Sequence, residues 1–240
     1  MTDDRGAPPP ASVVVRVEAV LTNASTTPAL VETADGVLRV MKFSGAGPGP
    51  FGLLTELLAL GIARALGAPV PAAGPVWLPE GFPWVVGTDE FDAMLQRSTG
   101  WNLGIAWLAD ARAATPEDVA AAPAAVLDAI ALADALLQNV DRTARNPNLL
   151  VAGGRLRAID YDACLYLSRA LAGRPATPVL PPGHLLTGRH PRGPLPALDL
   201  GALVAAAPSD WIAAAGTDRA GLAGALAQYF SGAAAILTNS

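Results

Sequence analysis

Short runs of β-forming residues alternate with turn residues in the first part of the chain. Val13–Val20 is rich in valine, and the runs Ala29–Glu32 and Val37–Phe43 lie on either side of Asp35-Gly36, a dipeptide typical of tight hairpin turns. Farther along, Leu53–Leu66 is mostly apolar and helix-forming, and a glycine and two prolines follow it closely. The pattern therefore predicts a small sheet and one helix.

The remainder of the chain has the spacing of helices, with one hairpin embedded in it. Thr115-Pro116 is typical of a helix start, and apolar residues then recur at helical intervals, although Pro123 should kink or restart the helix. The segment 149–159 contains two short β-forming runs around a Gly-Gly pair, which predicts a second hairpin. Residues 173–196 are rich in proline and glycine, and a loop of that length is usually functional or mobile.

This order of elements predicts an α+β protein with two lobes and a cleft between them. We expect residues 1–12 to form a disordered tail, residues 13–90 a small β-rich N-terminal lobe with one helix, and residues 91–240 a mainly helical C-terminal lobe that carries the second hairpin. The composition agrees with a folded protein, because hydrophobic residues make up 52% of the chain and charged residues only 15%.

The charge and the cysteine count exclude several classes of function. A net charge of −5 argues against a general binder of nucleic acid or of anionic membranes. The single cysteine, Cys164, excludes an internal disulfide framework and a metal site made of cysteines alone. The first residues show neither a basic start nor an apolar run, and no stretch approaches the roughly 18 apolar residues of a spanning helix. We therefore expect a soluble, cytoplasmic protein.

Polar residues around the second hairpin have a spacing that suits phosphoryl transfer. Asp141 and Asn146 are five positions apart, and Asp160 follows the hairpin nineteen positions after Asp141. In kinases, an aspartate on such a loop lies beside the attacking hydroxyl, while an amide oxygen and a second carboxylate hold Mg²⁺. Lys42 is the only lysine among 16 basic residues, and it lies near the end of a predicted strand, where kinases place a phosphate-pairing lysine. The alternative for the Asp141 segment alone is an ordinary polar turn.

Three further features each leave two interpretations open. Glu56 is the only carboxylate of the first predicted helix, and it either holds the Lys42 ammonium toward the phosphates or is a solvated helix position. The glycines of residues 44–52 either let the backbone approach a nucleotide or form a flexible connector, since no Gly-Lys-Ser/Thr of a Walker loop follows them. Arg142 and Arg145 either pair with a phosphoryl group or make structural ion pairs.

Three segments carry a family resemblance. They read L-R-V-M-K-F-S-G-A-G-P-G-P from Leu38, E-L-L-A-L-G-I-A-R-A-L-G-A-P-V-P from Glu56, and N-V-D-R-T-A-R-N-P-N-L-L from Asn139 with A-I-D-Y-D-A-C-L-Y from Ala158. In these segments the chain resembles the bacterial HipA-like kinase family, and its short stand-alone branch in particular. The resemblance covers roughly residues 14–190, and it implies a two-lobed protein-kinase-like fold, Mg-ATP as cofactor and transfer of the γ-phosphate to a Ser/Thr hydroxyl.

Carried over by position, the resemblance implies a role for each matching residue. Lys42 would bind phosphates, Asp141 would be the catalytic base, and Asn146 and Asp160 would hold Mg²⁺. The loop with Ser25-Thr26 would occupy the family's phosphate-loop position, where related toxins phosphorylate themselves. The resemblance also implies a serine or threonine of a protein as acceptor and an antitoxin-like protein as partner.

Two residues depart from the kinase pattern. Asp162 stands where most kinases have a glycine after the metal-binding acid, and Val140 stands where protein kinases have an arginine before the catalytic aspartate. Together with a glycine-poor phosphate loop, Asp162 leaves a second hypothesis, a pseudokinase that binds a nucleotide or a partner without turnover. A third hypothesis is a small-molecule phosphotransferase in which residues 173–196 form a metabolite pocket.

Overall fold

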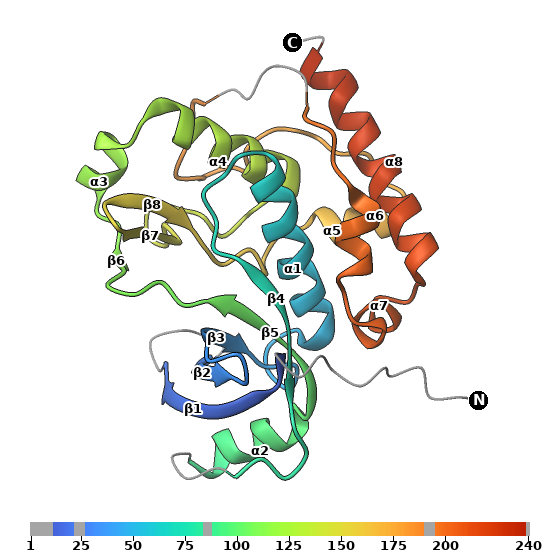
Figure 1. The fold of residues 1–240 in the computed structure, drawn as a ribbon. Helices are drawn as coiled ribbons and strands as arrows, with labels where there is room; N and C mark the ends of the chain where they lie inside the picture. Colours follow the sequence, from blue (N-terminus) through green and yellow to red (C-terminus); the bar gives the residue numbers. More distant parts are fainter. Residues whose placement is uncertain (1–11, 22–26, 84–87, 190–194, 239–240) are drawn as a thin grey trace.

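The computed structural model describes residues 12–21, 27–83, 88–189 and 195–238. An antiparallel sheet comes first along the chain and most helices follow it, so the predicted α+β class is confirmed (Figure 1). Residues 1–11 of the predicted tail lie outside the described residues, as do Ser25 and Thr26 of the predicted phosphate loop.

The first sheet has five strands in the order β1-β2-β3-β5-β4, and all neighbouring strands run antiparallel. Its strands are β1 (Val14–Val20), β2 (Ala29–Thr33), β3 (Leu38–Lys42), β4 (Ala73–Leu78) and β5 (Gly100–Ala106). The turn at Asp35-Gly36 joins β2 to β3, as the sequence predicts, and Gly36 adopts the left-handed φ of 74° that such turns require.

The structure corrects the predicted lobe boundary at residues 90 and 91. Strand β5 comes after that boundary, yet it lies between β3 and β4 in the first sheet, and helix α2 (Asp89–Arg97) packs on the same sheet. The sequence of β5, G-W-N-L-G-I-A, does not alternate apolar and polar residues, because a central strand is covered on both faces. The N-terminal lobe therefore extends to Ala106.

Helix α1 (Gly49–Ala65) begins four residues before the predicted start at Leu53. Pro50 is tolerated there because the first turn of a helix leaves its N–H groups without partners in any case. The preceding Gly45 lies against the end of α2, where its N–H donates to Ser98 Oγ at 2.9 Å and where a Cβ would come within 2.7 Å of that oxygen. This glycine thus has a packing role.

The C-terminal lobe contains a second, three-stranded sheet and six helices in the described part of the chain. The strands are β6 (Arg112–Ala113), β7 (Leu149–Ala152) and β8 (Arg155–Ala158), and the helices are α3 (Pro116–Ala121), α4 (Ala124–Leu137), α5 (Tyr166–Leu171), α6 (Leu200–Ala205), α7 (Ser209–Ala214) and α8 (Arg219–Thr238). The predicted β7–β8 hairpin and the predicted helix restart at Pro123 are confirmed. Within the described residues, no helix is long and apolar enough to cross a lipid bilayer.

Two hydrophobic clusters lie on opposite faces of the first sheet. The smaller cluster fills the space between the sheet and α2, and it includes Met41 and Val76. The larger cluster joins the other face, through Leu103 and Ile105, to α1, α4 and the remaining helices. Helix α1 therefore runs between the sheet and the helical lobe (Figure 1), and 11 of its 17 residues are buried.

Candidate active site

Lys42 is the last residue of β3, and it lies on the face of the sheet that is covered by α1. Side chains alternate between the two faces of a strand. Met41 packs into the smaller cluster, so Lys42 shares the opposite face with Val40, which packs against the larger cluster. The lysine side chain is only 12% exposed. The strand thus directs the only lysine of the chain toward helix α1.

Glu56 meets Lys42 from helix α1. Its side chain is fully buried, which excludes the solvated alternative, and its Oε2 lies 2.6 Å from Lys42 Nζ. This contact is an ion pair without hydrogen-bond geometry, and neither carboxylate oxygen makes a hydrogen bond to a described residue. Burial raises the pKa of Glu56 to about 7, and the nearby Lys42 charge offsets only part of that rise.

Asp160 and Asp162 meet the same ammonium from the segment that follows β8. Lys42 Nζ donates to Asp160 Oδ1 at 2.6 Å and to Asp162 Oδ2 at 3.2 Å. Burial disfavours the charged form of Lys42, but the carboxylates of Glu56, Asp160 and Asp162 outweigh this effect and raise the pKa of the ammonium. We call these four side chains the lysine cluster. Sequence reasoning expected three of them near each other and treated Asp162 only as a departure.

A second group of polar side chains lies on the loop after α4. Asp141 Oδ2 accepts hydrogen bonds from Asn146 Nδ2 at 2.7 Å and from Asn148 Nδ2 at 3.0 Å, and the Asp141 N–H donates to Asn139 Oδ1 at 3.1 Å. The structure therefore brings the predicted pair Asp141 and Asn146 together. Because the Asn146 nitrogen faces Asp141, its amide oxygen is the atom suited to bind a cation.

Backbone contacts hold this loop beside the segment that contributes Asp160. The Ile159 N–H donates to Asn148 O at 3.0 Å, and the Leu165 N–H donates to Gln138 O at 3.2 Å. The β7–β8 hairpin joins the two segments, so Asp141 and Asp160 lie on adjacent stretches of backbone. No hydrogen bond or ion pair between described residues links Asp141 or Asn146 directly to the lysine cluster.

A buried network that sequence reasoning missed anchors the Asp141 loop. Asp134 on α4 accepts hydrogen bonds from Asn139 Nδ2 at 3.1 Å and from Arg142 Nε at 2.6 Å. Arg142 in turn donates to Asn148 O at 2.6 Å. Of the two interpretations of Arg142, the structural ion pair is therefore correct. A signal was present, because a carboxylate within the apolar run of α4 needs a buried partner.

His184 adds a third partner to Asp134 from the long Pro- and Gly-rich loop. Its Nδ1 accepts from the Leu186 N–H at 3.1 Å, so the hydrogen of the neutral ring lies on Nε2, which donates to Asp134 Oδ2 at 3.1 Å. The Leu185 N–H also donates to Arg142 O at 2.9 Å. We call Asp134, Asn139, Arg142 and His184 the Asp134 cluster, and it joins this loop to the one that carries Asp141.

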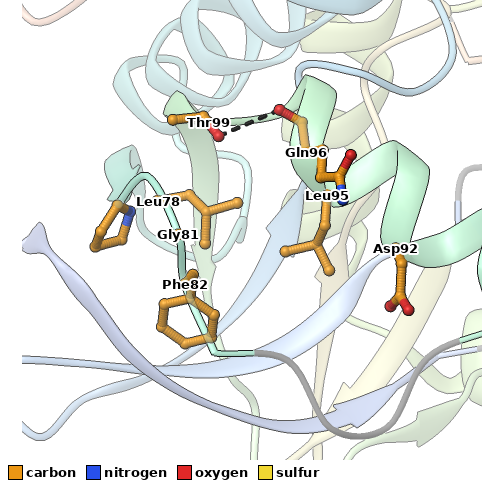
Figure 2. A pocket seen from close by; sticks show the side chains of 8 residues that line it. Leu78, Gly81, Phe82, Asp92, Leu95, Gln96 and Thr99 are labelled. Carbon is orange, nitrogen blue, oxygen red and sulfur yellow. Dashed lines mark hydrogen bonds between the residues drawn. The ribbon is translucent and has the colours of Figure 1, made fainter.

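Two cavities differ in size and in chemistry. The larger, about 310 Å³, lies in the N-terminal lobe beside α2, and its described lining contains no lysine or arginine that could pair with phosphates (Figure 2). The smaller, about 10 Å³, lies at the lysine cluster, and its lining includes Lys42, Glu56 and Asp162. It has room for one water or small ion. The cluster is open to solvent at Asp160, whose side chain is 35% exposed.

Comparisons with known proteins found few matches. No protein family matches the sequence, and no curated protein matches it. Among solved structures, the chain is similar to the Helicobacter pylori proinflammatory kinase CtkA, with a TM-score of 0.40 and 17% sequence identity. The similarity covers 63% of this chain and 58% of the CtkA chain. Membership of the HipA-like family stays a prediction.

Proposed function

We propose that the chain is an ATP-dependent phosphotransferase that moves the γ-phosphate of ATP to a hydroxyl group. The convergence of Lys42, Glu56 and Asp160 carries the proposal. A strand lysine paired with a helix glutamate, beside an aspartate after a hairpin, is the arrangement with which protein kinases hold nucleotide phosphates. The spacing in the chain is long, since 118 positions separate Lys42 and Asp160, so a chance meeting is a poor explanation.

Each residue has a defined task in this proposal. Lys42 pairs with the phosphates, and Glu56 restrains the ammonium from inside the lobe. Asp141 accepts a hydrogen bond from the acceptor hydroxyl and orients it toward the phosphorus, and Asn146 and Asn148 hold the Asp141 carboxylate in turn. Catalysis of this kind consists mainly of positioning and electrostatic stabilisation.

The donor atoms available fit Mg²⁺. Magnesium prefers oxygen ligands and is usually held by one or two carboxylates together with substrate phosphates. Asp160 and the amide oxygen of Asn146 would hold it, and the bound ion would neutralise charge on the phosphates. The buried Glu56 carboxylate, whose oxygens make no hydrogen bond of good geometry with a described residue, adds to the negative potential beside Asp160.

We extend the proposal to a serine or threonine of a protein as acceptor, on the HipA-like resemblance. On the same basis, the partner would be an antitoxin-like protein, and the Ser25-Thr26 loop would be a self-phosphorylation site.

A second candidate function is a pseudokinase, and one observation favours it. Asp162 contacts Lys42 Nζ at 3.2 Å, so it adds a competitor for the ammonium that the phosphates need.

The test is transfer of radiolabelled γ-phosphate in the presence of Mg²⁺, to the chain itself and to proteins of a cell lysate. Asp141→Asn should lower the transfer rate by a factor of about 10² to 10⁴, the usual contribution of a positioned acid–base group. The matched control is Asp128→Asn, which changes an exposed aspartate on α4 that pairs with Arg189 at the surface, and this variant should transfer at the normal rate. Nucleotide binding without any transfer would favour the pseudokinase, and transfer undiminished in Asp141→Asn would contradict the role of Asp141.

A further inference from the structure

The lysine cluster contains more negative than positive groups. The ligand oxygens of Glu56, Asp160 and Asp162 all lie within 4.8 Å of one another, and a single ammonium lies among them. Carboxylates gathered this closely repel one another unless cations compensate them. Lys42 supplies only one positive charge, fewer than the two carboxylates of Asp160 and Asp162 alone, so the cluster as a whole attracts a further cation.

A second observation points to an occupant of the cluster. Glu56 is fully buried, and its Oε1 has no hydrogen-bond or ion-pair partner among the described residues. Buried polar atoms are nearly always paired, so an orphan of this kind calls for an explanation. The oxygen belongs to a residue that lines the cavity of about 10 Å³ together with Asp162, and this cavity has room for one small occupant.

From these contacts we infer that Asp160 and Asp162 together hold a divalent cation, Mg²⁺ or Mn²⁺, before any nucleotide binds. Both carboxylates are reachable from solvent, since their side chains are 35% and 24% exposed. That exposure suits Mg²⁺, which keeps several of its waters when it binds a protein. A water of the bound ion would also supply the missing partner of Glu56 Oε1, while Lys42 stays paired with Glu56.

Asp162 is the residue that makes this site distinct from the one proposed for Mg-ATP, in which Asn146 and Asp160 are the ligands. Any role of Asp162 in phosphate transfer rests on the proposed function, whereas the cation site is argued from the contacts alone. The competing account gives Asp162 no cation and treats it only as a restraint on Lys42. The two accounts predict opposite results when the Asp162 charge is removed.

The experiment is a titration of the nucleotide-free full chain with Mn²⁺, followed by the electron paramagnetic resonance signal of the free ion. The unmodified chain should bind Mn²⁺, and Asp162→Asn should weaken the affinity by about 10- to 100-fold, as loss of a metal-site partner commonly does. Asp162→Glu, which keeps a carboxylate, should restore part of the affinity. Asp128→Asn removes an exposed charge of α4 and should bind Mn²⁺ like the unmodified chain.

An unchanged Mn²⁺ affinity in Asp162→Asn would overturn the inference. The inference would also fail if the only effect of Asp162→Asn were tighter binding of nucleotide in the absence of metal. The unmodified chain supplies a measurement that does not depend on a variant, because Mn²⁺ should raise its melting temperature without nucleotide. The absence of any rise would also overturn the inference. A chain that binds Mn²⁺ through Asp162 but transfers no phosphate contradicts only the proposed function. Phosphate transfer with Mn²⁺ binding independent of Asp162 contradicts only this inference.

Discussion

The lysine cluster and the Asp134 cluster both contain buried charged groups, but they differ in how many hydrogen bonds their buried carboxylate oxygens accept. In the Asp134 cluster, Oδ1 of Asp134 accepts from Asn139, and Oδ2 accepts from Arg142 and His184. In the lysine cluster, neither oxygen of Glu56 makes a hydrogen bond of good geometry with a described residue, and only Oε2 has an ion-pair contact, with Lys42 Nζ at 2.6 Å. One buried carboxylate is thus fully satisfied by the protein, and the other is not.

The pKa values of the two carboxyls move in opposite directions, although burial acts on both in the same direction. Burial raises the pKa of both groups, but at Asp134 the Arg142 charge and the hydrogen bond from His184 outweigh it and lower the pKa. At Glu56, burial dominates and the pKa rises to about 7. A satisfied buried network fixes a conformation, whereas an unpaired buried polar atom is uncommon and is explained by strain, by a catalytic role or by a bound water or ion. The first cluster therefore fixes the loop that carries Asp141, and the unsatisfied oxygens of the second agree with the cation- and phosphate-binding role that we propose for it.

The strongest test of this difference is Asp134→Asn, which leaves the buried Arg142 guanidinium without a charged partner. We expect the free energy of unfolding to fall by about 3–5 kcal/mol, the usual cost of breaking a buried ion pair from one side. Urea denaturation measures this as a lower midpoint with an unchanged slope. Asp128→Asn, on the exposed side of the same helix, should change the free energy by less than about 1 kcal/mol. Equal losses in both variants would contradict the structural role of the Asp134 cluster.

The two clusters also differ in how far the sequence predicts them. The sequence predicts that three members of the lysine cluster lie near each other, because strand, helix and hairpin signals put Lys42, Glu56 and Asp160 at kinase-like positions. The Asp134 cluster was not expected, because its members come from positions 134 to 184 and only the folded chain brings His184 to α4. Local patterns do not encode such long-range hydrogen bonds.

Local sequence patterns also predict only part of the fold. Hairpins with glycine turns and the helix break at Pro123 follow from local chemistry, and all of these are confirmed. Residues 100–106, which form strand β5, fall instead within the predicted helical lobe, because a central strand covered on both faces loses its alternating pattern. Its place in the sheet depends on β3 and β4, which are distant in sequence.

A second test changes the unsatisfied carboxylate by Glu56→Gln, with EDTA present to remove divalent cations. A buried carboxyl whose pKa rises from 4.5 to about 7 on folding stabilises the protein fully below pH 4.5, and that contribution is lost as the pH rises through about 7. The full contribution is about 3 kcal/mol, since one pKa unit corresponds to about 1.4 kcal/mol.

The measurement is urea denaturation of both proteins at several values between pH 5 and pH 8. The unmodified chain should lose stability relative to Glu56→Gln across this range, because the glutamine has no proton to release. Parallel pH profiles of the two proteins would show that Glu56 is satisfied in solution, and the contrast with Asp134 would then fail.

The smallest expected effect concerns Tyr161, which lies beside the Asp134 cluster with the Arg142 guanidinium 5.0 Å above its ring. Its hydroxyl oxygen is buried and makes no hydrogen bond of good geometry with a described residue. Tyr161→Phe keeps the ring under the guanidinium and removes only this unsatisfied group, so the free energy of unfolding should rise slightly, by up to about 1 kcal/mol. The matched control is Tyr166→Phe, where the equally buried hydroxyl donates to Thr55 O at 3.0 Å, and where urea denaturation should show a loss of about 1–2 kcal/mol. A loss in Tyr161→Phe as large as in Tyr166→Phe would mean that the Tyr161 hydroxyl has a partner in solution.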